Sequence, residues 1–143
     1  MLTYSAKGEK AMNYNIKQVA DKTGLSEATL RYYDKEGLFP DLERKNSGYR
    51  TFSERELEQI RYIECFKTAG FEIREIKEYF DLIKRGDETL KERYDIMVKH
   101  REILEKKKEA ILHSISVVDK KIDYYARAVE KGTEEGVELN KCF

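Results

Sequence analysis

The spacing of hydrophobic residues predicts two short helices near the start of the chain. The first carries apolar positions at helical intervals from Ile16 to Ala20, and Thr23-Gly24 breaks the pattern. The second follows Ser26, a favoured N-cap residue, and ends at Gly37. Two short helices joined by a tight turn that contains glycine are typical of a helix-turn-helix unit. The same pattern occurs in ordinary helical hairpins, so by itself it favours DNA binding only modestly.

A turn-rich segment and two further helices follow. From Asp41 to Phe52, Asn46-Ser47-Gly48 provides turn chemistry and the alternation after it suits a short strand, which predicts a β-hairpin. Ser53 and Glu56 form a capping box at the start of a third helix. Its apolar face is Leu57, Ile60 and Ile63, Ala69-Gly70 ends it, and the fourth amphipathic helix carries Ile73, Ile76, Tyr79, Phe80 and Ile83 up to Arg85-Gly86.

A heptad repeat begins at Leu90. Ten of its twelve seam positions are apolar or aromatic, which predicts a coiled-coil helix about 60 Å long. The exceptions, Arg101 and Lys108, would each face their own copy in a parallel dimer, so an antiparallel homodimer is favoured. The predicted dimer seam includes Leu90, Met97, Leu104, Ile111, Ile115, Val118, Ile122 and Tyr125.

Composition supports a mainly helical protein, and the hydrophobic pattern divides it into a small domain and a long helix. The 143 residues include one proline and eight glycines, and 39% are charged. We expect a mainly α fold: a disordered leader at 1–12, a winged helix-turn-helix domain at 13–86, a dimerisation helix forming an antiparallel coiled coil at 87–131, and a short tail at 132–143. Met12 is an alternative start. No stretch is apolar enough to span a membrane and no signal peptide begins the chain, so we expect a cytoplasmic location without membrane contact.

The charge balance argues against a uniformly basic DNA-binding surface. The 28 basic and 28 acidic residues give a formal net charge of zero. The segment from Arg44 to Arg50, however, carries three basic residues and no acid. Local positive charge is what phosphate binding requires, so attraction to DNA would be confined to small patches.

Several motifs at matching distances give the sequence a specific resemblance. These are Asn15 to Ala20, Thr23-Gly24-Leu25-Ser26, Leu30-Arg31-Tyr32-Tyr33-Asp34, Gly48-Tyr49-Arg50 and Ala69-Gly70-Phe71. Together with the long helix they resemble the MerR family of bacterial transcription regulators, over about residues 14 to 130. The resemblance implies a dimer that binds double-stranded promoter DNA and distorts it, which affects RNA polymerase indirectly.

The resemblance and the chemistry of the side chains select the residues expected to contact DNA. Long donors on the exposed face of a recognition helix read bases or phosphates, while apolar residues such as Leu30 lie beneath. One of the two adjacent tyrosines should belong to the core, and Tyr32 is preferred as the contact. The predicted DNA-binding set is Ser26, Thr29, Arg31, Tyr32, Tyr33, Arg44, Lys45, Tyr49 and Arg50, the last four on the hairpin "wing".

The effector is less determined by the sequence. Only about a dozen residues follow the coiled coil, so no separate ligand domain is expected, and His100 and His113 are too far apart to bind one metal ion. We expect neither metal nor cofactor. Cys65 is a candidate thiol sensor, because the region after it is similar to the aldehyde- and electrophile-responsive branch of the family, and Arg61 and Lys67 lie within helical reach. A small, half-buried structural residue is the competing interpretation. Cys142 is expected to be a tail thiol.

Other classes of function have less support. An architectural, excisionase-like protein that bends DNA without an effector is the main alternative, although such proteins usually lack a long dimer helix. An adaptor that has lost DNA binding is disfavoured by Arg31 and Arg50. No phosphate-binding loop, nucleophile and base pair or fixed carboxylate pair indicates an enzyme.

Overall fold

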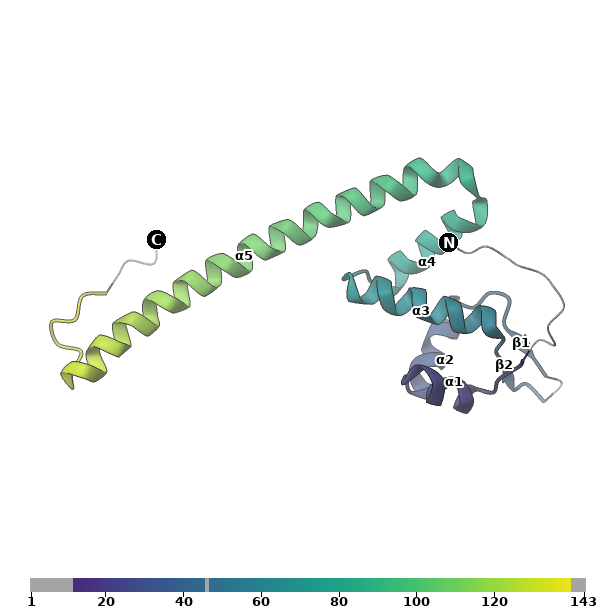
Figure 1. The fold of residues 1–143 in the computed structure, drawn as a ribbon, viewed down its shortest axis with the longest axis horizontal. Helices are drawn as coiled ribbons and strands as arrows, with labels where there is room; N and C mark the ends of the chain where they lie inside the picture. The colour runs from purple at the N-terminus through teal and green to yellow at the C-terminus, as the bar shows by residue number, and fades with distance from the viewer. Residues whose placement is uncertain (1–11, 46, 140–143) are drawn as a thin grey trace. The chain divides into compact units, whose positions relative to one another are not determined.

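The chain divides into two compact units, one ending at Thr89 and the other beginning at Leu90. The computed structural model describes residues 12–45 and 47–139, so most of the predicted leader lies outside the described residues. The first unit contains helices α1 (Ile16–Thr23), α2 (Glu27–Lys35), α3 (Glu54–Thr68) and α4 (Ile73–Arg85), strands β1 (Glu43–Arg44) and β2 (Arg50–Thr51), and the 3-10 turn η1 (Asp87–Thr89) (Figure 1). The predicted order of elements is confirmed.

Local capping defines the helix-turn-helix unit. Asn15 and Gln18 form a reciprocal capping box at the start of α1, in which each backbone N–H donates to the other's side-chain oxygen. Gly24 ends α1 with φ +74°, a left-handed conformation that favours glycine. α1 packs on α2 and α3, with Val19 and Leu30 fully buried between them. Two helices too short to be stable alone are therefore held by a shared core.

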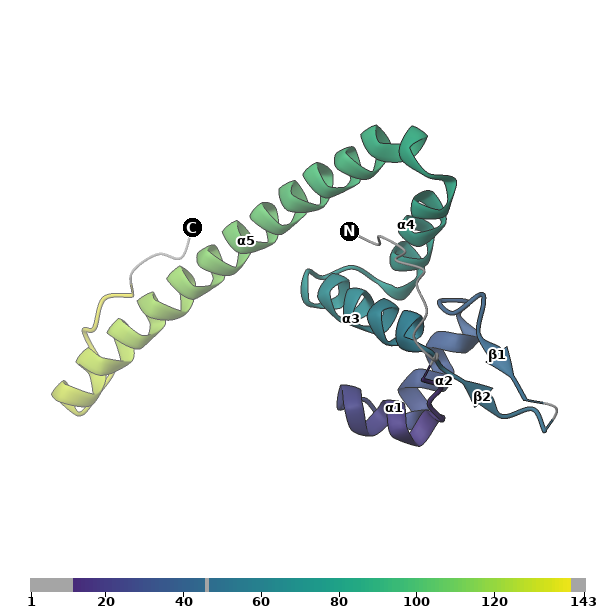
Figure 2. The ribbon, with the colours of Figure 1, turned by 45° about the vertical axis from the view of Figure 1, so that its right-hand side comes forward.

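The wing is a minimal antiparallel hairpin. β1 pairs with β2 so that Glu43 lies opposite Thr51 and Arg44 opposite Arg50, and the hairpin extends beyond the neighbouring helices (Figure 2). Its base is anchored at Phe52, which is fully buried and exchanges two backbone hydrogen bonds with Tyr14. The predicted hairpin is confirmed, and its base belongs to the core while its tip is exposed.

Helices α3 and α4 complete the first unit. The predicted capping box is present, since Glu56 accepts hydrogen bonds from the backbone and hydroxyl of Ser53. Leu57, Ile60 and Ile63 are buried as expected. The link between α3 and α4 is aromatic: Phe66 contacts Phe71, Tyr79 and Phe80 through ring centroids 4.8 to 6.3 Å apart.

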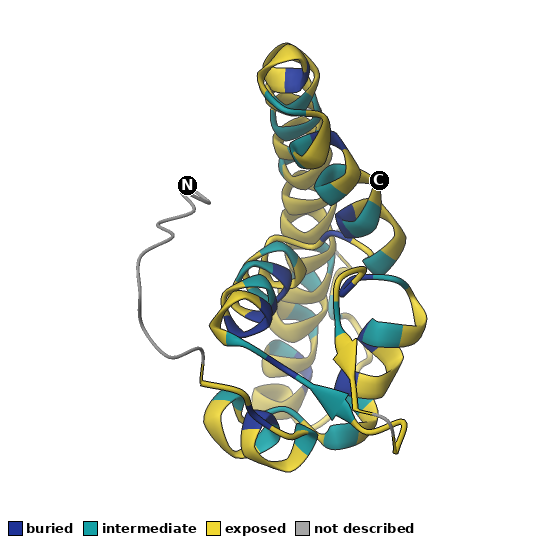
Figure 3. Cartoon of the chain, turned by 90° about the vertical axis from the view of Figure 1, so that its right-hand side faces the viewer, coloured by how far each residue is buried: buried dark blue, intermediate teal, exposed yellow. Residues whose placement is uncertain are grey.

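The second unit is dominated by one helix, α5 (Leu90–Lys131). Its 42 residues give the helix a length of about 63 Å. Apart from the half-buried Met97, every residue of the predicted dimer seam is exposed, and Figure 3 colours most of the helix accordingly. After Gly132 (φ +78°) the tail turns back, and Arg127 donates a hydrogen bond to the carbonyl of Glu138. Residues 132–139 therefore have a defined course beside the helix end, whereas Cys142 lies outside the described residues.

The division between the units falls three residues after the predicted boundary at residue 86. Thr89 is buried in the first unit, where its hydroxyl donates to the carbonyls of Leu82 and Gly86. Among the described residues, no helix combines the length and apolar content needed to cross a membrane.

Candidate nucleic-acid interface

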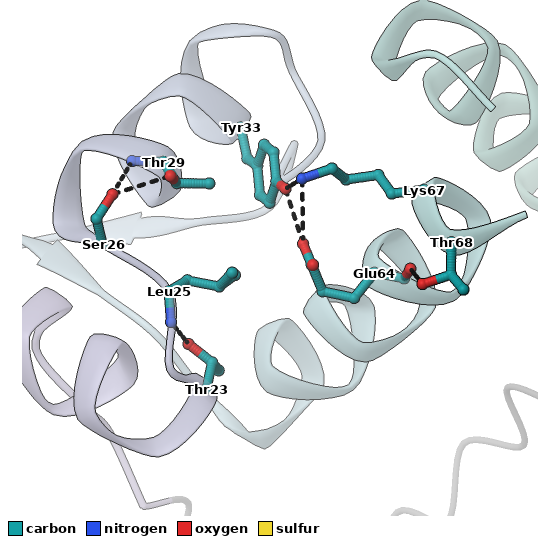
Figure 4. Close-up of polar contacts among 8 residues, drawn as sticks. All are labelled: Thr23, Leu25, Ser26, Thr29, Tyr33, Glu64, Lys67 and Thr68. Atoms are coloured by element: carbon teal, nitrogen blue, oxygen red, sulfur yellow. Dashed lines mark hydrogen bonds and ion pairs between the residues drawn. The ribbon is translucent and has the colours of Figure 1, made fainter. Parts of the chain in front are cut away.

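The start of α2 is exposed and held by its cap. The Ser26 hydroxyl accepts a hydrogen bond from the backbone N–H of Thr29 at 3.0 Å and lies 2.9 Å from the Thr29 hydroxyl (Figure 4). Ser26 is exposed and Thr29 is half-buried. The two hydroxyls therefore form a small polar group at the positive end of the helix dipole, where anions such as phosphate are favoured.

Arg31 and Tyr32 lie on the exposed side of α2. The Arg31 guanidinium is 2.8 Å from the Glu27 carboxylate, one helical turn earlier. Exposed ion pairs of this kind contribute little, roughly 0–1 kcal/mol, so Arg31 can exchange Glu27 for a phosphate or base at small cost. The Tyr32 side chain is 47% exposed, which leaves its hydroxyl available to a ligand.

Tyr33 requires a correction to the predicted contact set. Its side chain is only 1% exposed, and its hydroxyl donates a 2.7 Å hydrogen bond to Glu64 on α3. The Tyr33 ring therefore belongs to the core between α2 and α3, and this side chain does not face a ligand. Tyr33 and Leu30 share a face because they are three residues apart on the helix, whereas Tyr32 is turned away by about 100°.

A polar network around the Tyr33 hydroxyl joins α2 to α3. The Lys67 ammonium donates to the same hydroxyl at 2.7 Å and lies 3.8 Å from the Glu64 carboxylate (Figure 4). Burial raises the pKa of Tyr33, with the bond to Glu64 adding to the rise. The pKa of Lys67 is raised mainly by its hydrogen bond to Tyr33. The network thus holds a neutral phenol between an ammonium and a carboxylate.

Asp34 connects α2 to the wing. Its Oδ2 accepts hydrogen bonds from Arg50 Nε at 2.6 Å and from Arg44 Nη2 at 2.7 Å. In the sequence, Asp34 is part of the motif Leu30-Arg31-Tyr32-Tyr33-Asp34, and nothing local indicates its partners. The available signal was an acid in that motif, followed by a segment of three basic residues without an acid. In three dimensions the acid is supplied from α2.

The remaining wing residues are exposed. Tyr49 is 73% exposed, and Lys45 is exposed beside it at the hairpin tip. The backbone N–H of Lys45 donates to the Tyr49 carbonyl at 3.0 Å, which closes the turn. The structure thus brings Arg44, Lys45, Tyr49 and Arg50 together on one hairpin that is tied to the end of α2.

Cys65 lies on α3, outside these two elements. Its thiol is exposed, which is more than the partial exposure that its position next to the core stripe suggests. Lys67, expected to assist it, instead donates to Tyr33. Within residues 12–45 and 47–139, no group of three or more His, Cys, Asp or Glu side chains is arranged to hold a metal ion.

Comparisons with known proteins agree with this arrangement. The sequence model described as MerR HTH family regulatory protein matches residues 14–83. The crystal structure of a MerR family transcriptional regulator from Bacillus thuringiensis is 34% identical, covers 78% of this chain and 98% of its own, and superposes with a TM-score of 0.59. This chain belongs to the MerR family of helix-turn-helix regulators.

Two further members of the MerR family show how far the likeness extends. HiNmlR, described as a MerR family regulator lacking the sensor domain and bound to promoter DNA, is 28% identical over 88% of this chain and 100% of its own, with a TM-score of 0.66. The transcriptional regulator AdhR of Bacillus subtilis (strain 168) is 44% identical over 77 residues, 54% of this chain and 55% of AdhR. The match thus spans just over half the length of AdhR.

Membership of the MerR family confirms several predictions at the level of the family. The relatives are transcription regulators and not enzymes, and the fold combines a DNA-binding winged helix-turn-helix with a long helix. The individual DNA-contacting residues, the effector and the domain boundaries are not decided by these comparisons and stay predictions.

Proposed function

We propose that this MerR-family chain acts as a homodimer that recognises promoter DNA through α2 and the wing. The observation that carries the proposal is that exposed donors from two elements belong to one unit: Ser26, Arg31 and Tyr32 on α2, and Lys45 and Tyr49 on the wing. A helix of this size fits the major groove, and a hairpin beside it can reach the flanking phosphates. Arg44 and Arg50 contribute the remaining positive charge.

The second part of the proposal is that α5 pairs with α5 of a second copy. Its exposed apolar residues recur at coiled-coil spacing from Leu90 to Val129, and residues such as Ile111 and Ile122 are each 60% exposed in the single chain. A soluble protein rarely leaves such a continuous apolar stripe in water. The occupant is a second copy because the stripe has the length and heptad pattern of the same helix.

The charged seam positions select the direction and register of the pair. With two antiparallel seams overlapping along their full length, Arg101 faces the partner's Val118 and Lys108 faces the partner's Ile111. Neither cation then faces a like charge, and the apolar ends at Leu90 and Val129 cover each other. A parallel pair would instead place Lys108 beside the partner's Lys108 in a desolvated position, which is costly.

We also propose that the dimer distorts the promoter DNA that it binds. One dimer carries two DNA-binding units, and binding both to one duplex requires the DNA to match their separation and orientation. DNA that is bent or untwisted to fit carries an elastic cost of order 1–6 kcal/mol, which can change how RNA polymerase engages the promoter. HiNmlR, which has a structure bound to promoter DNA, supports promoter binding, and the distortion rests on the dimer argument alone.

The proposal is tested by footprinting the purified protein on the DNA upstream of its own gene, followed by transcription in vitro. We expect a symmetric protected region and a changed transcription rate. An excisionase-like architectural protein would also protect and bend DNA, but the transcription rate would not respond when a thiol-reactive compound is added. The proposal would be contradicted if the protein gave no footprint on the upstream DNA and also bound no duplex from a pool of random sequences.

A response to electrophiles through Cys65 is a second, separate proposal. Three observations support it: the thiol is exposed, it lies on α3, and its neighbours Glu64 and Lys67 bond to Tyr33 of the recognition helix. A group added at Cys65 would act through the backbone of α3, the helix that carries both contacts to α2.

Cys65→Ser is expected to bind the upstream DNA within about twofold of the wild type, because the substitution is nearly isosteric and exposed. The variant should no longer respond to an aldehyde or to a thiol oxidant in a promoter–reporter assay. Cys142→Ser provides the matched control and should respond as the wild type does. An unchanged response in Cys65→Ser would rule out this sensor.

A further inference from the structure

One carboxylate of the recognition helix binds both arginines of the wing. Asp34 lies near the end of α2, and its side chain is 11% exposed. Arg44 on β1 and Arg50 on β2 lie directly opposite each other in the hairpin, and both donate to the same oxygen, Asp34 Oδ2. The arrangement links three elements, α2, β1 and β2, through a single atom.

We propose that Asp34 is a positioning residue that sets the specificity of DNA binding by fixing the wing to the recognition helix. The proposal rests on the proposed function, in which α2 and the wing contact one duplex together. Asp34 would then determine how far the wing contacts lie from the groove contacts. Its own carboxylate touches no DNA.

The wing needs an external support of this kind because it is weak by itself. Each strand has only two residues, and an isolated two-stranded hairpin is at best marginally stable in water. Arg44 and Arg50 are like charges directly opposite each other, which destabilises a strand pair. The Asp34 carboxylate offsets that repulsion. The wing is anchored at its base by Phe52, and Asp34 adds a side-chain contact from α2 to the region between base and tip.

The geometry also leaves the arginines able to bind phosphate. Arg50 uses Nε and Arg44 uses Nη2 toward Asp34, and a guanidinium has five N–H donors in a fixed plane. Holding one edge of each guanidinium directs its remaining donors. Pre-organisation of this type raises affinity for the matching partner without adding a contact.

The sign of the effect separates positioning from simple electrostatics. Removing a negative charge from a DNA-binding surface should strengthen binding to every duplex, because phosphates are repelled less. If Asp34 positions the wing, its removal should weaken binding to the recognised sequence and spare binding to random DNA. The two explanations thus predict opposite changes for the recognised sequence.

The experiment compares Asp34→Asn with the matched control Asp41→Asn. Asp41 lies between α2 and β1, and its carboxylate is 2.8 Å from the Arg55 guanidinium. The control therefore removes the same charge and leaves the bonds from Asp34 to Arg44 and Arg50 in place. The probes are a duplex that the wild type selects from a random pool and a random-sequence duplex of equal length. The dissociation constant is measured over a range of KCl concentrations, and circular dichroism verifies the fold.

For Asp34→Asn we expect about a tenfold loss of affinity for the selected duplex, equivalent to about 1.4 kcal/mol, with no loss for random DNA. The slope of affinity against salt should stay within about one counterion of the wild-type slope. Asp41→Asn should bind both duplexes at least as well as the wild type. Wild-type or tighter binding of the selected duplex by Asp34→Asn would overturn the proposal.

Arg44→Gln provides a second variant that keeps the proposal testable if Asp34→Asn does not fold. Arg44 is 48% exposed, so its replacement should be tolerated. We expect it to lower affinity for the selected duplex by a larger factor than affinity for random DNA, a comparison that does not need Asp34→Asn. Where Asp34→Asn folds, the double variant should lose less than the sum of the two single losses. Fully additive losses would mean that Arg44 acts independently of Asp34. If the wild type selected no duplex at all, the proposed function and not this inference would have failed.

Discussion

Two neighbouring tyrosines on α2 have opposite environments. Tyr32 is 47% exposed, whereas Tyr33 is 1% exposed and bonded to Glu64 and Lys67. The difference follows from helix geometry, since consecutive residues are rotated by about 100° and only one can share the face of Leu30. The pair therefore divides two tasks, with Tyr33 stabilising the contact between α2 and α3 and Tyr32 available to DNA.

Replacing each tyrosine by phenylalanine should therefore affect a different property: stability for Tyr33 and DNA binding for Tyr32. Tyr33→Phe should lower the free energy of unfolding by about 1–2 kcal/mol, because Glu64 and Lys67 lose the hydroxyl of a buried side chain as their hydrogen-bond partner. Tyr32→Phe should leave stability within about 0.5 kcal/mol and weaken DNA binding if its hydroxyl contacts a phosphate. Urea denaturation and DNA titration measure the two quantities. Equal stability of the two variants would contradict the assignment.

Helix α5 has a hydrophobic seam that stays largely exposed among the residues the structure describes, 12–45 and 47–139. The seam residues are spaced for coiled-coil packing, and the fold-back tail contacts the helix through Tyr124 and Arg127 instead. Ala128 is 6% exposed, and its carbonyl accepts hydrogen bonds from the backbone N–H groups of Gly132 and Thr133, where the chain turns back. Val129 remains 79% exposed, so the tail leaves the seam accessible to a second helix.

The full-overlap register predicts a specific cross-link between copies. Leu104 faces the partner's Ile115, so the double variant Leu104→Cys/Ile115→Cys, made with Cys65 and Cys142 changed to Ser, should oxidise to a covalent dimer on a denaturing gel. Disulfides form only where Cα atoms approach within about 7 Å. Leu104→Cys/Ile122→Cys is the matched control, because a shift by one heptad would bring that pair together. Cross-linking in the control alone would contradict the register.

At the level of the whole molecule, the proposed dimer would compensate for a neutral chain. The formal net charge is zero, and each copy concentrates its candidate DNA contacts on α2 and the wing. One small patch binds DNA weakly, but the proposed dimer would link two patches, so that both would bind the same duplex. The second binding event becomes intramolecular and raises affinity by about 10²–10⁴ without any new contact.

Breaking the dimer should therefore cost affinity without altering the DNA-binding unit. Ile115→Glu introduces a charge into the seam, and we expect a monomer in sedimentation at micromolar concentration. Binding to the full selected duplex should fall by about 100-fold, whereas binding to a half-site duplex should be unchanged. Ser114→Glu, one position away from the seam, should remain dimeric. Full affinity of a monomeric Ile115→Glu would show that dimerisation is not required for tight binding.

Much of the fold was predictable because its signals are local. Helix starts were marked by Ser26 and by Ser53 with Glu56, and glycines such as Gly24 marked ends, since caps depend on residues within one turn. The seam of α5 was equally readable because coiled-coil packing repeats every seven residues. Family membership followed from motif blocks at fixed distances within residues 14–83.

The tertiary structure decided which of the polar residues on these elements work together. Tyr33 meets Glu64 and Lys67 across 31 and 34 positions, and Asp34 meets Arg44 and Arg50 across a loop and a hairpin. No local pattern specifies such pairs, because each depends on how separate elements pack. The sequence alone thus determined the elements, the family and the seam. The burial of Tyr33 in the core and the pairing of Asp34 with the wing arginines depend on the tertiary structure, because burial and ion pairing are properties of the assembled fold.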